Sequence, residues 1–67
     1  MGKRIELLSF RKRHNLTQKE MAAKLAITAT HYSRIETGSS NPSYEILERF
    51  KEVFGITEVF EIFEKYQ

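Results

Sequence analysis

Residues 16–38 constrain this chain more than any other segment, because two helix starts and one helix stop fall within a short length. Thr17 and Glu20 form a T-x-x-E capping box, in which the side chain of each accepts a hydrogen bond from the other's amide. Thr28 is a second N-cap, and Gly38 stands where a helix ends with a positive φ. The pattern predicts two short helices joined by a turn of about three residues.

The second helix of this pair has one apolar side and one polar side. Tyr32 and Ile35 recur at i, i+3 and face inward together with Ile27 of the turn. The outward side is short, polar and not blocked by bulky apolar groups. It carries Ala29, Thr30, Ser33 and Arg34.

The flanking segments predict three more helices. One covers residues 3–14, the next begins at the N-cap Ser43 and ends at Gly55, and the last begins at Thr57 and runs to residue 67. The apolar residues that recur at helical spacing in the first two are Leu7, Phe10, Leu47, Phe50 and Phe54. We therefore expect an all-α bundle of five helices.

Composition excludes several classes of protein. The chain has no cysteine, and its two histidines are isolated, so we expect no disulfide framework and no metal site. It has no Gly-rich phosphate loop and no cluster of histidine and carboxylate groups, so we expect neither an enzyme nor a cofactor. No run of about 18 apolar residues and no long hydrophobic N-terminus is present. We expect a soluble, cytoplasmic protein with no membrane partner.

Charge is distributed unevenly along the chain. Residues 1–34 carry eight basic and two acidic side chains, a net charge of +6. Residues 35–67 carry three basic and seven acidic side chains, a net charge of −4. A chain polarised in this way presents its basic part to a polyanion. The alternative is a solvated surface of mixed charge.

The motifs LTQKEMAAKL, YSRIETG and NPS follow one another between residues 16 and 43. Together they resemble the phage-repressor family of Xre-like and Cro-like helix-turn-helix proteins, over roughly residues 5–56. The resemblance implies a lambda-repressor-like fold, with residues 1–67 as one DNA-binding domain around a core motif at 17–38. Two features depart from the family pattern: Ala26 stands where the family carries Gly, and residues 57–67 lose its apolar register.

In this motif the outward face of the third helix enters the major groove. Arg34 can donate both guanidinium arms to a guanine, and the methyl groups of Ala29 and Thr30 suit contact with thymine, with Ser33 as a weaker contributor. The alternatives are a surface arginine paired with a glutamate for Arg34, and helix-start propensity for Ala29 and Thr30.

Contacts to the DNA backbone are expected beside this face. Gln18 matches a family position that donates to a phosphate, at the start of a helix. The other candidates are Thr28, Ser39, Ser40 and Asn41. Four further basic residues add nonspecific attraction or are simply solvated: Lys3, Arg4, Lys12 and Arg13.

The resemblance gives two other residues a structural role. Arg11 and Glu36 match an arginine and a glutamate that form an ion pair between the first helix and the end of the third. Such a pair fixes the tilt of the third helix, and the loss of one partner costs more than the loss of an exposed salt bridge.

The C-terminal segment carries more apolar surface than one helical face can bury. We expect part of it to form the interface of a homodimer, with the candidates Val59, Phe60, Phe63 and Tyr66. The alternative is that these side chains complete a core over the first and fourth helices.

These features predict a sequence-specific DNA-binding transcription regulator. The expected form is a small dimeric repressor on a palindromic operator, of the prophage, mobile-element or restriction-control kind. The alternative is a protein-interaction module on the same scaffold, an antirepressor or antitoxin that binds a second regulatory protein or a toxin.

Overall fold

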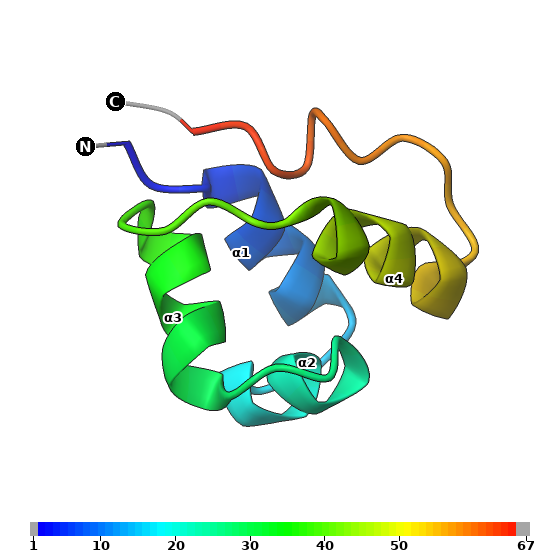
Figure 1. Cartoon of the computed structure of the whole chain (residues 1–67), viewed down its shortest axis with the longest axis horizontal. Coiled ribbons are helices and arrows are strands. Elements are labelled where there is room, and N and C mark those ends of the chain that lie inside the picture. The colour runs from blue at the N-terminus through cyan, green and yellow to red at the C-terminus, as the bar shows by residue number, and fades with distance from the viewer. Residues whose placement is uncertain (1, 66–67) are drawn as a thin grey trace.

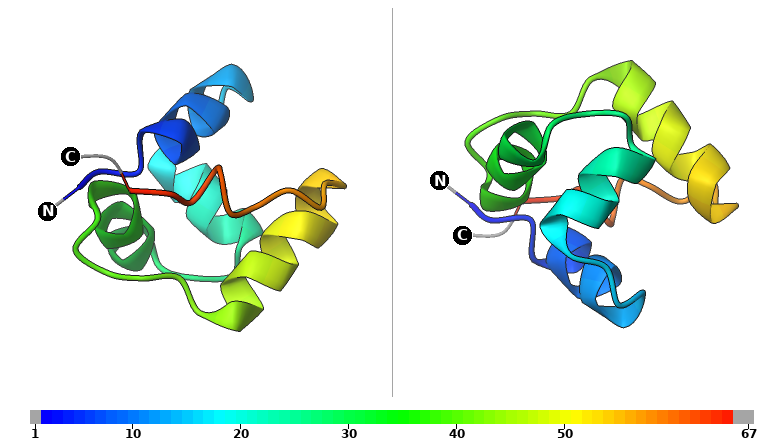
Figure 2. Two further views of the ribbon diagram at one scale, coloured as in Figure 1. Left: turned by 90° about the horizontal axis from the view of Figure 1, so that it is seen from above. Right: turned by 90° about the horizontal axis from the view of Figure 1, so that it is seen from below.

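The computed structural model describes residues 2–65. Over this range the chain forms four helices and no strand: α1 (Ile5–Arg13), α2 (Gln18–Lys24), α3 (Ala29–Thr37) and α4 (Tyr44–Phe54). In the view of Figure 1, α3 lies to the left of α1, α4 to its right and α2 below it, and Figure 2 shows α1 at one edge of the molecule. The segment after α4 returns across α1 toward the start of the chain, and both views of Figure 2 show it between α1 and α4.

The predicted caps set the helix starts. Thr17 and Glu20 form the complete capping box at α2, with hydrogen bonds of 3.1 and 2.8 Å. Thr28 accepts from the His31 amide at α3, and Ser43 caps α4 in the same way. These local signals hold because a short polar side chain satisfies amides that the first turn leaves unpaired.

A left-handed residue lies at the end of each of the four helices, and the one after α2 is Ala26 with φ 58°. Asn15 follows α1 with φ 55°, Gly38 ends α3 with φ 90°, and Gly55 ends α4 with φ 63°. Gly38 is required for a second reason, because a Cβ atom at this position would lie 1.8 Å from the carbonyl oxygen of Gly2. The start of the chain therefore packs directly against the end of α3.

Helix α1 begins two residues later than predicted. Arg4, just before it, has no short side chain with which to cap the helix, and its amide donates to the Glu36 carbonyl, 3.0 Å away. The tie to α3 holds the backbone at Arg4 outside the helical region.

The predicted fifth helix is wrong for the described part of the segment. Residues 57–65 are not helical: residues 60–63 form a turn, with a single i to i−4 backbone hydrogen bond, from the Phe63 amide to the Val59 carbonyl at 3.0 Å. A short helix is costly to nucleate without tertiary support. Here the Phe63 carbonyl is instead taken by the Arg4 side chain, at 2.8 Å. Residues 66 and 67 of this prediction lie outside the described range.

One core joins all four helices and the returning segment. Its buried apolar members are Leu7, Phe10, Met21, Ala22, Leu25, Tyr32, Ile35, Ile46, Phe50, Val59 and Phe63. In α4 the buried residues are Ile46 and Phe50, while the predicted Leu47 and Phe54 pack partly exposed at its edge. The rings of Phe10, Phe50 and Phe63 meet at centroid distances of 5.0 Å.

Val59 and Phe63 are therefore not available as interface residues. Both side chains lie inside the core of their own chain, where the ring of Phe63 packs edge-on against the ring of Phe50 of α4. Phe60 points outward and is 83% exposed. Tyr66 lies outside the described residues.

Within residues 2–65, every helix is too short or too polar to cross a lipid bilayer.

Candidate nucleic-acid interface

Helices α2 and α3 and the turn between them form a helix-turn-helix unit. The Ile27 amide donates to the Ala22 carbonyl at 3.0 Å, and Ala26 is left-handed with φ 58°. An alanine in this conformation costs on the order of 1 kcal/mol. Arg49 of α4 donates to the Leu25 carbonyl at 2.9 Å, which braces the turn from outside.

The outward face of α3 is open. Ala29, Thr30 and Arg34 are exposed and Ser33 is partly exposed, while Tyr32 and Ile35 on the opposite side are buried. Among residues 2–65 no carboxylate forms an ion pair with Arg34, which disfavours the reading of Arg34 as a paired surface residue.

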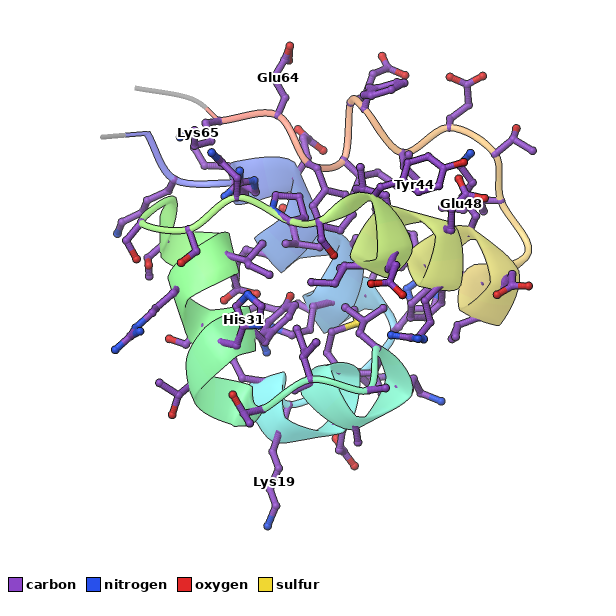
Figure 3. All side chains as sticks on the ribbon, in the orientation of Figure 1. Lys19, His31, Tyr44, Glu48, Glu64 and Lys65 are labelled. Atoms are coloured by element: carbon purple, nitrogen blue, oxygen red, sulfur yellow. The ribbon has the colours of Figure 1, made fainter. Side chains whose placement is uncertain are left out.

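The start of α2 and the end of the described C-terminal segment lie at opposite ends of the molecule. Lys19 projects from the start of α2 into solvent, whereas Glu64 and Lys65 lie at the opposite end of the molecule (Figure 3). The described part of the C-terminal segment therefore runs away from the start of α2 and leaves the outer face of α3 uncovered.

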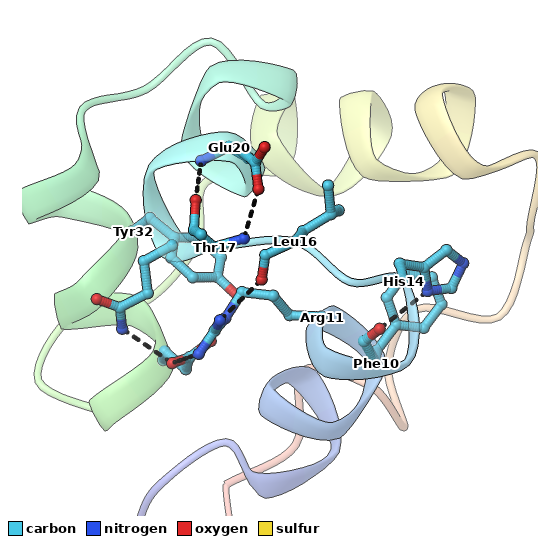
Figure 4. Close-up of polar contacts among 9 residues, drawn as sticks. Phe10, Arg11, His14, Leu16, Thr17, Glu20 and Tyr32 are labelled. Atoms are coloured by element: carbon cyan, nitrogen blue, oxygen red, sulfur yellow. Dashed lines mark hydrogen bonds and ion pairs between the residues drawn. The ribbon is translucent and has the colours of Figure 1, made fainter.

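Glu36, at the last turn of α3, holds the three N-terminal helices together. Figure 4 labels two of the residues that bind it, Arg11 and Tyr32. Its carboxylate accepts from Arg11 Nε at 2.8 Å and Nη2 at 3.1 Å, from the Tyr32 hydroxyl at 2.7 Å and from Gln18 Nε2 at 3.0 Å. The Glu36 side chain is only 7% exposed. Arg11 also donates to the Leu16 carbonyl, 2.9 Å away. The tilt of α3 is thus fixed against both α1 and α2.

This network sets the protonation of its members. Burial raises the pKa of the Glu36 carboxyl, but the hydrogen bonds from Arg11, Tyr32 and Gln18 and the Arg11 charge outweigh it, so the net pKa lies below its ordinary value. Burial, and then the Glu36 carboxylate, raise the pKa of the Tyr32 hydroxyl. Glu36 therefore stays ionised and Tyr32 stays a donor at neutral pH.

Gln18 is partly committed inside the protein. Its side-chain amide donates one N–H to Glu36, so the fold itself orients this amide at the start of α2. A second N–H belongs to the same nitrogen. Thr28 likewise uses its oxygen as an acceptor for the His31 amide and keeps a hydroxyl hydrogen to donate.

The loop of residues 38–43 lies beside the end of α3. The Ser39 amide donates to the Arg34 carbonyl at 2.9 Å, and the Ser40 amide donates to the same carbonyl at 3.1 Å. Ser39 and Asn41 are exposed and Ser40 is partly exposed. These three short polar residues occupy one compact loop at the edge of the α3 face.

Arg4 is the residue that sequence reasoning missed. The sequence left open whether Arg4 attracts DNA nonspecifically or is simply solvated, but its side chain is buried, with 3% exposed. Its Nε donates to the Phe63 carbonyl at 2.8 Å, and its Nη1 donates to the Ile35 carbonyl and, at 2.8 Å, to the Ser40 carbonyl. Its Nη2 donates to Asn41 Oδ1 at 3.0 Å. No local pattern around Arg4 signals this role, because every partner lies more than 30 residues away.

A comparison with protein families decides what this unit is. The family model described as helix-turn-helix matches residues 7–60 of the chain. The chain belongs to this helix-turn-helix family, of the Xre and Cro type. No curated protein and no solved structure matches it.

Membership gives this helix-turn-helix protein its general activity, that of a DNA-binding transcription regulator. The family is regulatory and typically non-enzymatic. Within the described range no three potential metal ligands of the His, Cys, Asp or Glu type gather at one place.

Proposed function

We propose that this helix-turn-helix protein reads a specific DNA sequence and acts as a small repressor that occupies a promoter operator as a homodimer. The observation that carries the proposal is the open outer face of α3, with Arg34 exposed and unpaired within residues 2–65. Prophages, mobile elements and restriction-control systems are the settings we propose for such a regulator.

Base readout is assigned to the outer face of α3. A guanidinium can donate two parallel hydrogen bonds to O6 and N7 of guanine, and Arg34 has no competing carboxylate among the described residues. Ala29 and Thr30 sit at the N-terminal end of the helix, where their methyl groups can contact thymine, and Ser33 lies between them and Arg34.

Backbone contacts are assigned to groups on both sides of that face. Gln18 can give its second amide N–H to a phosphate while Glu36 holds the first. The other proposed donors are the Thr28 hydroxyl, Ser39, Ser40 and Asn41. The basic N-terminal half adds attraction that depends on salt.

A twofold dimer would match a palindromic operator with half-sites about one helical turn apart. Phe60 is the residue we now propose at the interface, since it is the most exposed large apolar side chain of the described residues. Burial of such an exposed aromatic ring against a second subunit would stabilise the dimer.

Selection of bound duplexes from a random pool tests the proposal. We expect an enriched palindrome, and affinity for it that falls steeply with salt, since each neutralised phosphate releases counterions. Failure to enrich any sequence, or binding to a second protein that salt leaves unchanged, would instead favour an antirepressor or antitoxin on this scaffold.

A further inference from the structure

The charge of Arg4 is buried without an anion among its hydrogen-bond partners. All four acceptors of its guanidinium are neutral oxygen atoms, three of them backbone carbonyls and one the side-chain amide of Asn41. Burial lowers the pKa of Arg4, but a guanidinium remains protonated at neutral pH. The positive charge of Arg4 is therefore retained, and it interacts with the oxygen atoms around it.

What surrounds it is the C-terminal end of α3. The unpaired carbonyls at the end of a helix carry a partial negative charge, which repels a phosphate group. Arg4 donates to the Ile35 carbonyl in the last turn and to the Ser40 carbonyl just beyond it. It thereby offsets the negative end of the helix at the loop where Ser39, Ser40 and Asn41 are exposed or partly exposed.

Arg4 also orients Asn41. The Asn41 side-chain oxygen accepts from Arg4 Nη2, so its amide nitrogen keeps both N–H groups for another acceptor. Asn41 itself is exposed. An amide fixed at its oxygen and open at its nitrogen is suited to donate to a phosphate oxygen.

We propose that Arg4 is a positioning residue for DNA binding, which holds the loop of residues 38–43 in place and converts the negative end of α3 into a phosphate-binding edge. This inference rests on the proposed function. It assigns no base contact to Arg4, so its effect is the same on every duplex.

The clamp also reaches the C-terminal segment. Arg4 Nε holds the Phe63 carbonyl, so one guanidinium joins the start of the chain, the end of α3, the loop and the returning segment. Only the planar fork of an arginine can serve acceptors in these several directions at once, and a lysine ammonium of the same charge cannot replace it.

The test compares Arg4→Gln, Arg4→Lys and the matched control Lys3→Gln, which removes a charge from the exposed neighbouring residue. Affinity is measured by fluorescence anisotropy for the selected palindrome and for an unrelated duplex, well below the melting temperature of each variant. We expect Arg4→Gln to weaken both complexes about tenfold and Lys3→Gln by less than about threefold. Arg4→Lys should lie closer to Arg4→Gln than to the unsubstituted protein.

Several results would overturn this inference. One is equal affinity of Arg4→Gln and Lys3→Gln, which would make Arg4 a purely structural residue. Another is full affinity of Arg4→Lys, which would mean that charge alone suffices. If the Arg4 variants do not fold, Asn41→Ala is the variant that tests the proposal. We expect it to lower the affinity for both duplexes severalfold, and unchanged affinity would contradict the proposal.

The two proposals fail differently. If the unsubstituted protein binds no duplex, the proposed function and the role of Arg4 fall together. If it binds with steep salt dependence and Arg4→Gln matches Lys3→Gln, only the role of Arg4 is wrong.

Discussion

Two arginines of this molecule differ in their surroundings and therefore in the role that can be assigned to them. Arg34 lies on the open face of α3, whereas Arg11 is 12% exposed on its side chain and bound to Glu36. The two arginines have the same chemistry, and only their surroundings separate a proposed base contact from a structural ion pair.

Arg34→Ala should relax sequence preference and weaken binding to the cognate site by about 1 to 3 kcal/mol, because a bidentate guanine contact is lost. Gln18→Ala is the comparison, since it should weaken all duplexes alike. Anisotropy titrations against the cognate site and single-base variants separate the two patterns. Unchanged specificity in Arg34→Ala would show that another residue reads the base.

Glu36→Gln should destabilise the fold by on the order of 3 kcal/mol, because it leaves Arg11 with an uncompensated, largely buried charge. The matched control is Glu48→Gln, which breaks the exposed Glu48–Lys51 pair of 2.9 Å and should cost less than about 1 kcal/mol. Urea unfolding followed by circular dichroism gives both values. Equal losses would mean that the Glu36 network contributes no more than a surface pair.

The same carboxylate gives the fold a dependence on acid. Because the pKa of Glu36 is lower in the folded state, its stabilisation is fully present above the unfolded value of about 4.3 and is lost as pH falls through the folded value. The urea concentration at the unfolding midpoint, measured from pH 7 downward, should therefore decrease once the pH drops below about 4. This decrease should be less steep in Glu36→Gln. Parallel curves for the two proteins would contradict this account.

At the scale of elements, local signals were sufficient for α2, α3 and α4. Their N-caps and the glycines that end α3 and α4 act within a few residues, so each could be predicted from the sequence. The segment at 57–65 could not, because Thr57 resembles an N-cap while Phe63 and Arg4 determine the outcome through contacts with distant parts of the chain. The Arg4 clamp escaped prediction for the same reason.

Ala26→Gly should stabilise the protein by about 0.5 to 1 kcal/mol, since glycine adopts the left-handed conformation without strain. Ala23→Gly, at an exposed helical position three residues earlier, should instead destabilise by up to about 1 kcal/mol. Thermal unfolding of both variants is the measurement. A loss of stability in Ala26→Gly would mean that the methyl group of Ala26 makes a contact that outweighs its backbone strain.

At the scale of the whole molecule, the proposed homodimer depends on which apolar side chains the core leaves on the surface. The core accounts for Val59 and Phe63, which sequence periodicity alone could not distinguish from interface residues, since an apolar side chain is equally suited to either. Phe60 is the candidate that remains on the described surface.

Phe60→Ser should shift a dimer toward monomer without loss of folding, because the ring contributes little to its own core. Tyr44→Ser is the control, since Tyr44 is another exposed aromatic side chain, 76% exposed on α4. Sedimentation equilibrium of both variants measures the mass. An unchanged dimer in Phe60→Ser would place the interface elsewhere, and a monomeric unsubstituted protein would exclude the dimer.

The absence of a side chain at Gly38 has a large consequence for how the start of the chain packs. The Gly2 carbonyl fills the space that a methyl group would need, and Arg4 follows only two residues later. Alanine at position 38 would push the first residues outward and draw the guanidinium from its carbonyls. One added carbon atom, with no contact to a nucleotide, would thus separate the first residues of the chain from α3, the helix proposed to read the bases.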